Sequence, residues 1–144
     1  MAELHIAIVE CIQLSSDCSK GADGPIGFWD VSSLTDLGGL FMATDGNAIP
    51  EADKFNGDVS KWDVSRVKSM RATFAYTSVF NGHLSKWDVS RVTNMKGMFN
   101  DMSSFQGKGG LSKWDVSRVT HMEDLFSSAE SFNGDISKWD VSKV

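Results

Sequence analysis

The stretch SKWDVSRV at residues 60–67 recurs at 85–92 and 112–119, and it returns as SKWDVSKV at 137–144. An earlier, more divergent unit adds a fifth tryptophan, and the spacings between successive tryptophans are 33, 25, 27 and 25 residues: Trp29, Trp62, Trp87, Trp114 and Trp139. A period near 25 residues is typical of proteins whose repeats stack on one another. The repeat therefore predicts a stack of similar units in which one residue type fills the same interior position each time.

Within one unit, residues 84–99, the apolar pattern changes from strand-like to helical. The first part fits L-x-x-L-x-L, the strand-bearing stretch of a leucine-rich repeat, and apolar residues flank Asp88 over 87–89. Val92, Met95 and Phe99 then lie at i, i+3 and i+7, which favours a short helix. We therefore predict an α/β repeat: a leucine-rich-repeat-like solenoid with short parallel strands and short helices.

Smaller signals mark the ends of these predicted elements. Ser90 stands at a position suited to an N-cap of the predicted helix. Asn81-Gly82, repeated at 56–57 and 133–134, predicts a tight turn in which glycine adopts a positive φ.

The repeats divide the chain into predicted parts. Residues 1–25, which contain AELHIAIVECIQL, are expected to form an N-terminal helical cap over the first repeat. The solenoid is expected to hold about four and a half repeats: 26–54, 55–79, 80–104, 105–131 and an incomplete 132–144. Because the last unit stops at Val144, we expect either a fragment or a partner that covers this unit.

Composition limits the classes of partner. The chain of 144 residues has a formal net charge of −5 and no basic run, so nucleic-acid binding is not expected. Its longest apolar stretch, residues 4–14, is too short to span a membrane and includes Glu10, so no transmembrane segment is expected. The same stretch lacks a basic n-region and is a poor signal peptide.

The two cysteines, Cys11 and Cys18, lie seven residues apart. They either form a disulfide that closes a small loop or remain two free thiols, and the spacing alone does not choose between these states.

The unit F-N-G-[DH]-[VL]-S-K-W-D-V-S-R-V-x-x-M, with Phe four residues after Met, resembles the repeat of BspA-like surface proteins. That leucine-rich-repeat-like family was first noticed in mycoplasma and oral bacteria and is expanded in protists, including marine algae. The lead-in CIQLSSDCSKGADGPIGFWDVSSLTDL is similar to the start of algal and protist members. The resemblance implies a right-handed solenoid, a role in adhesion, display or protein binding, no enzymatic activity, and a secreted or cell-surface location.

Charged residues recur opposite the apolar face of each unit. They form a lysine column beside an aspartate column, from which we take these candidate binding residues: Lys61, Asp63, Lys86, Asp88, Lys113 and Asp115. One interpretation is a regular ligand surface suited to a protein or a repetitive glycan. The other is that lysines pair with aspartates of neighbouring units and keep the face soluble.

Two further candidates stand where the units disagree. Phe28 replaces the lysine of the later units, and Tyr76 is the single tyrosine of the chain. The insertion at 42–54 is expected near the same end, so that an exposed aromatic beside a long loop would form a contact site. Alternatively, the insertion folds back over Phe28.

No catalytic motif stands out, and no D-x-D-x-D-G loop indicates calcium, so neither an enzyme nor a cofactor or metal is expected. The leading functional prediction is a non-enzymatic protein-binding or scaffold module. The alternative is a structural accessory subunit of a larger complex, such as an organelle or photosynthetic complex, whose neighbour covers the last repeat. That setting would place the chain in an organelle and allow association with a membrane complex.

Overall fold

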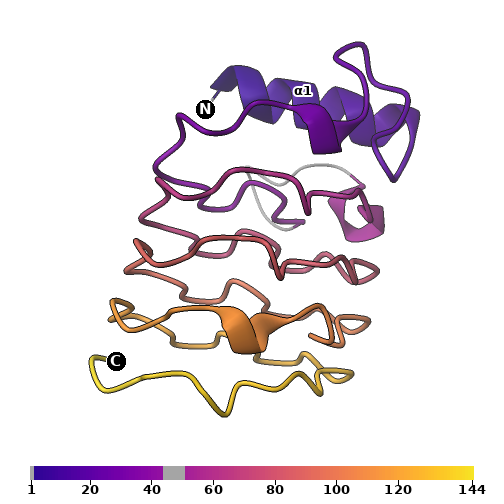
Figure 1. Cartoon of the computed structure of the whole chain (residues 1–144). Coiled ribbons are helices and arrows are strands. Elements are labelled where there is room, and N and C mark those ends of the chain that lie inside the picture. Colours follow the sequence, from indigo (N-terminus) through magenta and orange to yellow (C-terminus); the bar gives the residue numbers. More distant parts are fainter. Residues whose placement is uncertain (1, 44–50) are drawn as a thin grey trace.

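The computed structural model describes residues 2–43 and 51–144, which form a helix followed by a stack of coils (Figure 1). The helix α1, Ala2–Leu14, lies across the first coil, and later coils follow one below another. The other helices are single 3-10 turns: η1 Ile26–Phe28, η2 Ala52–Lys54 and η3 Leu111–Lys113. We number the coils as coil 1 (26–43), coil 2 (55–79), coil 3 (80–104), coil 4 (105–131) and coil 5 (132–144). The division into a cap and repeats stays a prediction.

The predicted leucine-rich-repeat-like α/β solenoid is wrong. The described residues contain no strand, and isolated parallel bridges are their only β pairing: Asp36 with Ser69, Ser69 with Asn94, and Asn94 with His121. The helix predicted over 92–99 is also absent, since α1 is the one α-helix in the described part of the chain. Turns and irregular coil make up most of each unit instead.

Hydrogen bonding explains why the helical pattern in coil 3 does not produce a helix. Some backbone N–H groups close turns within the coil, as when Met98 donates to the Met95 carbonyl (3.1 Å) and Asn100 to that of Gly97 (3.1 Å). The N–H groups that alternate with these donate to carbonyls of coil 4, at 2.8 to 3.0 Å: those of Met95, Gly97, Phe99 and Asp101. Those donors are therefore committed to the next coil and cannot bond to a carbonyl four residues earlier.

The predicted strand fails for a related reason. Turns bracket residues 87–89: Trp87 N–H donates to the Leu84 carbonyl (3.1 Å), and Val92 N–H donates to that of Val89 (2.9 Å). Between these turns, Asp88 and Val89 donate no backbone hydrogen bond to a neighbouring coil, so no ladder forms, although buried Trp87 and Val89 flank exposed Asp88. Ser90 is not a helix N-cap, because no helix begins there; its backbone N–H closes a turn by donating to the Asp88 carboxylate (3.0 Å).

The tryptophans join each coil to the one before it. Their indole Nε1 groups donate to backbone carbonyls at 2.8 to 3.0 Å: Trp62 to Ile26, Trp87 to Val59, Trp114 to Leu84, and Trp139 to Leu111. Each of these carbonyls also accepts the backbone N–H that closes a turn in its own coil, so the indole adds a second hydrogen bond that ties residues far apart in sequence. This geometry requires an indole rather than a phenyl ring, which accounts for tryptophan at this position of the repeat.

Phenylalanines form two parallel columns in the interior, beside buried valine, leucine and methionine side chains. One column stacks with centroid separations of 5.2, 6.3 and 5.5 Å: Phe41, Phe74, Phe99 and Phe126. The second has separations of 5.8, 6.4 and 6.2 Å: Phe55, Phe80, Phe105 and Phe132. The two columns touch where one coil passes into the next, for example Phe74 at the end of coil 2 against Phe80 at the start of coil 3, with ring centroids 4.5 Å apart. These rings form a continuous core that no single repeat could bury alone.

The glycines of the Asn-Gly pairs have a different role from the predicted one. Gly57, Gly82 and Gly134 are absent from the glycines with positive φ. A Cβ built on Gly82 would instead lie 2.6 Å from Cζ of Phe80, a ring that is completely buried. The unit F-N-G therefore needs glycine because the phenylalanine ring packs over it.

We expect Gly82→Ala to lower the free energy of unfolding by about 1–3 kcal/mol, because the buried Phe80 ring has to move aside. Urea unfolding measures this cost. In a Phe80→Leu background the same substitution should cost less, since the ring that it meets is gone. Equal costs in the two backgrounds would contradict this role of the ring.

Candidate functional site

The aspartates of the WDVS units stabilise turns. In each unit the carboxylate accepts a hydrogen bond from the backbone N–H of the serine two residues later, at 3.0 or 3.1 Å: Asp30, Asp63, Asp88, Asp115 and Asp140. Asp58 and Asp135 do the same in the preceding turn, at 3.0 Å. The recurrence of Asp-x-Ser is thus explained by local turn geometry.

These hydrogen bonds favour the charged carboxylates. The Ser32 hydroxyl and backbone N–H, at 2.7 and 3.0 Å, hold the pKa of Asp30 below its ordinary value of 3.8. The Ser137 hydroxyl and N–H lower the pKa of Asp135 in the same way. The folded state therefore binds protons at these sites less readily than the unfolded chain does.

Stability should consequently fall in acid. Because the folded-state pKa values are depressed, this contribution is present above the unfolded value of 3.8 and lost as pH falls through the folded values. We expect the urea midpoint to drop between about pH 6 and about pH 3. A variant with Asp30→Asn and Asp135→Asn keeps an acceptor oxygen but does not titrate, so its midpoint should drop less. An equal drop in both proteins would contradict the assignment.

The lysine column is not paired with the aspartate column. Over residues 2–43 and 51–144, the ion pair that the structure contains is Lys54 with Glu51. The six lysines and aspartates proposed for binding all lie exposed at the surface: Lys61, Asp63, Lys86, Asp88, Lys113 and Asp115. Pairing between neighbouring units therefore does not explain this face, whose aspartates are held by serine instead.

Lys61 has a different neighbour, Phe28. The Phe28 side chain is 73% exposed, and Lys61 Nζ lies 4.3 Å from the centroid of its ring. Such an exposed cation–π contact contributes about 0.5–1 kcal/mol. The two side chains border a hollow of about 250 Å³ that Asp17, Asn56 and Asp58 also line. The first two coils thus bring together two of the predicted binding residues. The insertion expected beside them falls partly at 44–50, outside the described residues.

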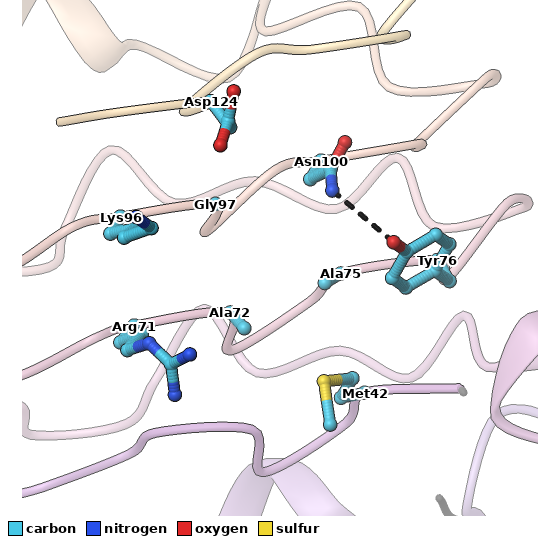
Figure 2. Close-up of a pocket in the computed structure, with 9 residues that line it drawn as sticks. All are labelled: Met42, Arg71, Ala72, Ala75, Tyr76, Lys96, Gly97, Asn100 and Asp124. Carbon is cyan, nitrogen blue, oxygen red and sulfur yellow. Dashed lines mark hydrogen bonds between the residues drawn. The ribbon is translucent and has the colours of Figure 1, made fainter. Parts of the chain in front are cut away.

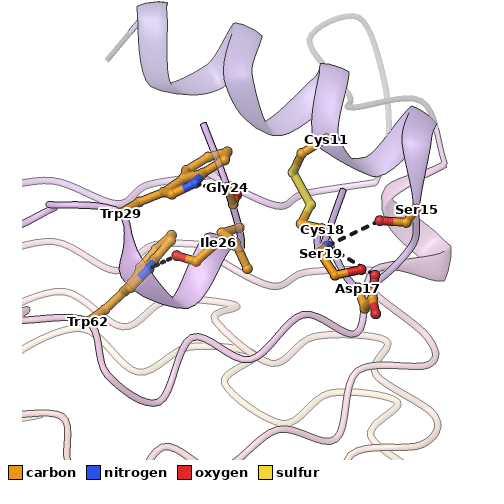
Figure 3. Close-up of a disulfide and its surroundings, with 9 residues drawn as sticks. All are labelled: Cys11, Ser15, Asp17, Cys18, Ser19, Gly24, Ile26, Trp29 and Trp62. Atoms are coloured by element: carbon orange, nitrogen blue, oxygen red, sulfur yellow. Dashed lines mark hydrogen bonds between the residues drawn. A yellow bond between two sulfur atoms is a disulfide. The ribbon is translucent and has the colours of Figure 1, made fainter. Parts of the chain in front are cut away.

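A disulfide lies near this hollow (Figure 3). It joins Cys11 of α1 to Cys18 in the following loop, and both cysteines are buried. The loop between them is shaped by Ser19 N–H, which donates to Ser15 Oγ and Asp17 Oδ1, each at 3.1 Å. Of the two states left open by the sequence, the structure contains the disulfide.

A second hollow, which we call the Tyr76 groove, crosses coils 1 to 4 and has a volume of about 310 Å³. Figure 2 shows Arg71 and Lys96 at one side, and Tyr76 and Asn100 at the other. The amide Nδ2 of Asn100 donates to the Tyr76 hydroxyl at 3.5 Å. The groove is completed by Met42, Ala72, Ala75, Gly97 and Asp124.

The floor of the groove follows from the turn pattern of the coils. Equivalent positions in successive coils adopt a positive φ: Gly39 (63°), Ala72 (54°), Gly97 (61°) and Asp124 (57°). This conformation favours glycine and disfavours large side chains, which leaves a shallow channel between longer neighbours. Tyr76 also has a positive φ of 66°, a conformation that is unusual for a bulky residue, and its side chain lines the groove.

The repeat resemblance is supported by one comparison. The family model described as "Mycoplasma protein of unknown function, DUF285" matches residues 10–109 and residues 45–144. The chain belongs to this family. The two matches overlap, as expected when a model of tandem repeats fits the same chain in two registers. No curated protein and no solved structure matches the chain significantly.

In this member of the DUF285 family, the structure separates the residues predicted for binding. Phe28 and Lys61 border one hollow, Tyr76 lines the other, and the remaining lysines and aspartates lie outside the linings of both. Sequence reasoning missed Arg71, Lys96 and Asn100. Arg71 and Lys96 occupy equivalent positions of their coils, each two residues after a bridged residue, and we call this position the slot. The slot holds Gly38 and Glu123 in other units, and this variation between units was the signal that could have identified the two cations.

Two other observations bear on chemistry. Within the described ranges, no group of three or more His, Cys, Asp or Glu side chains is placed to hold a metal ion. No helix there combines the length and the apolar character needed to cross a bilayer.

Proposed function

We propose that the chain is a non-enzymatic, protein-binding module of the surface-repeat type, and that the Tyr76 groove is its contact site. The observation that carries this proposal is the groove itself, in which an aromatic ring, two cations and an amide surround small residues. Tyrosine and arginine, like tryptophan, are enriched among the side chains that anchor protein interfaces. Membership in a family of tandem repeats supports the class of protein.

The coils suit this role because they hold side chains in fixed relative positions. Groove residues of neighbouring coils are linked by backbone hydrogen bonds, such as Ala72 N–H to the Lys96 carbonyl (2.9 Å) and Tyr76 N–H to that of Asn100 (2.8 Å). Their backbone groups are therefore engaged within the stack, and a partner would be recognised through side chains. A site held in this way loses little conformational entropy on binding.

The test is site-specific photo-crosslinking in the cells that make the protein. A photoreactive phenylalanine analogue replaces Tyr76 in one variant and exposed Arg118, outside the groove, in a matched control. We expect a discrete protein adduct from position 76 and none from position 118. Adducts of equal yield from both positions, or from neither, would contradict the groove as a protein-binding site. Adducts confined to coil 5 in a third variant, at Val141, would favour the alternative of a structural subunit.

A further inference from the structure

We propose that the Tyr76 groove binds a single carboxylate side chain of an acidic protein segment, held between Arg71 and Lys96. The inference rests on the proposed function, and it names the chemistry that the groove recognises.

Arg71 and Lys96 act together because they occupy the same slot in neighbouring coils. The backbone bond from Ala72 N–H to the Lys96 carbonyl, 2.9 Å long, sets the two coils side by side at this point. In the part of the chain that the structure describes, no carboxylate oxygen lies within 4.0 Å of either cation, since the ion pair present is Lys54 with Glu51. Two like charges one coil apart repel each other, and an anion between them relieves that repulsion.

The groove also suits the carbon stem of an acidic side chain. Its floor is built from Ala72, Ala75 and Gly97, so that a ligand can approach the backbone closely. Met42 and the Tyr76 ring offer apolar contact on the walls. A guanidinium and an ammonium then meet the carboxylate, which Arg can bind through two parallel hydrogen bonds.

Charge further along the groove argues against an extended polyanion. The slot that holds Arg71 and Lys96 is Glu123 in coil 4, and Asp124 next to it lines the groove (Figure 2). A polyuronate or nucleic acid crossing the coils would meet these carboxylates, and the whole chain carries a net charge of −5. A volume of about 310 Å³ is at the small end for a ligand site and fits one side chain.

The experiment is an NMR titration of the full 15N-labelled chain with N-acetyl-glutamate N-methylamide, compared with the glutamine analogue at matched ionic strength. We expect the glutamate probe to shift the backbone amides of Arg71, Ala72, Lys96 and Gly97, with saturation, and the glutamine probe to leave them in place. Equal shifts with both probes, or shifts concentrated at other lysines, would overturn the proposal. Tighter binding of oligogalacturonate than of the glutamate probe would overturn the single-carboxylate assignment.

Variants locate the interaction. Lys96→Met should weaken the glutamate probe about tenfold, the loss expected for one hydrogen bond between charged groups. Lys113→Met, in the exposed column outside the groove, should leave the dissociation constant unchanged, and an equal loss there would overturn the proposal. The two proposals fail separately. If position 76 crosslinks to a protein but the glutamate probe causes no shifts, only the carboxylate proposal is refuted. If the glutamate probe binds but no protein adduct forms, the proposal of protein binding is refuted.

Discussion

Replacing Phe99 by alanine will lower the free energy of unfolding by about 3–5 kcal/mol. The Phe99 side chain is completely buried and lies at the centre of the aromatic core. Its ring centroid is 6.3 Å from that of Phe74, 4.6 Å from Phe105 and 5.5 Å from Phe126. Removing it opens a cavity between coils 2 and 4, and the coils cannot close that cavity without breaking the hydrogen bonds that set their spacing.

Urea unfolding of purified variants measures this loss, and Phe126→Ala provides a matched control. Phe126 occupies the same position one coil later but is only half-buried, so its removal costs less apolar burial and leaves a smaller cavity. We expect a clear difference between the two midpoints. Equal losses would mean that the column does not act as a continuous core.

The second large effect is expected at the disulfide. Breaking the Cys11–Cys18 bond by replacing both residues with alanine will cost about 2–3 kcal/mol, because a loop of this length gains chain entropy when it is opened in the unfolded state. Alanine is preferred to serine, since both cysteines are almost completely buried and a hydroxyl there would add its own desolvation cost.

Amide hydrogen exchange measures which parts of the chain lose stability when the disulfide is broken. The bond ties α1 to the lead-in, and Ile8 and Ile12 of the helix pack into the same core. The protection of backbone amides from exchange should therefore fall first in α1 and coil 1, whereas the amides of coil 4 should keep their protection. Reduction of the wild-type protein should reproduce the effect. A reduced protein with unchanged stability and unchanged protection of α1 would contradict this prediction.

The repeat pattern predicted several features that the structure contains. Stacking of similar units, burial of three of the tryptophans (Trp62, Trp87 and Trp114) and the helix over the apolar stretch near the N-terminus were all predictable, because spacing reports which side chains share a buried face. The same spacing did not predict the backbone path. Buried residues at i, i+3 and i+7 are compatible with a helix and also with successive turns, as coil 3 shows through Met95 and Phe99.

For the candidate site, too, the sequence predicted some residues and missed others. Phe28 and Tyr76 were found in the sequence because they break the repeat, and each borders a hollow. Arg71 and Lys96 were missed because their importance depends on which slots of neighbouring coils face one channel. The serine partners of the aspartates were missed too, since an Asp-x-Ser turn and a lysine–aspartate ladder predict the same sequence.

The sequence by itself determined that this protein is a stack, because four nearly identical copies of one unit require four nearly identical surroundings. Only the tertiary structure decided what the stacked unit is. Met95, Gly97 and Phe99 donate their N–H groups to carbonyls of the next coil, beginning with His121, more than 20 residues away. Local periodicity cannot report hydrogen-bond partners at that distance. These bonds between coils replace the predicted strand and helix by a series of turns, with a groove across them.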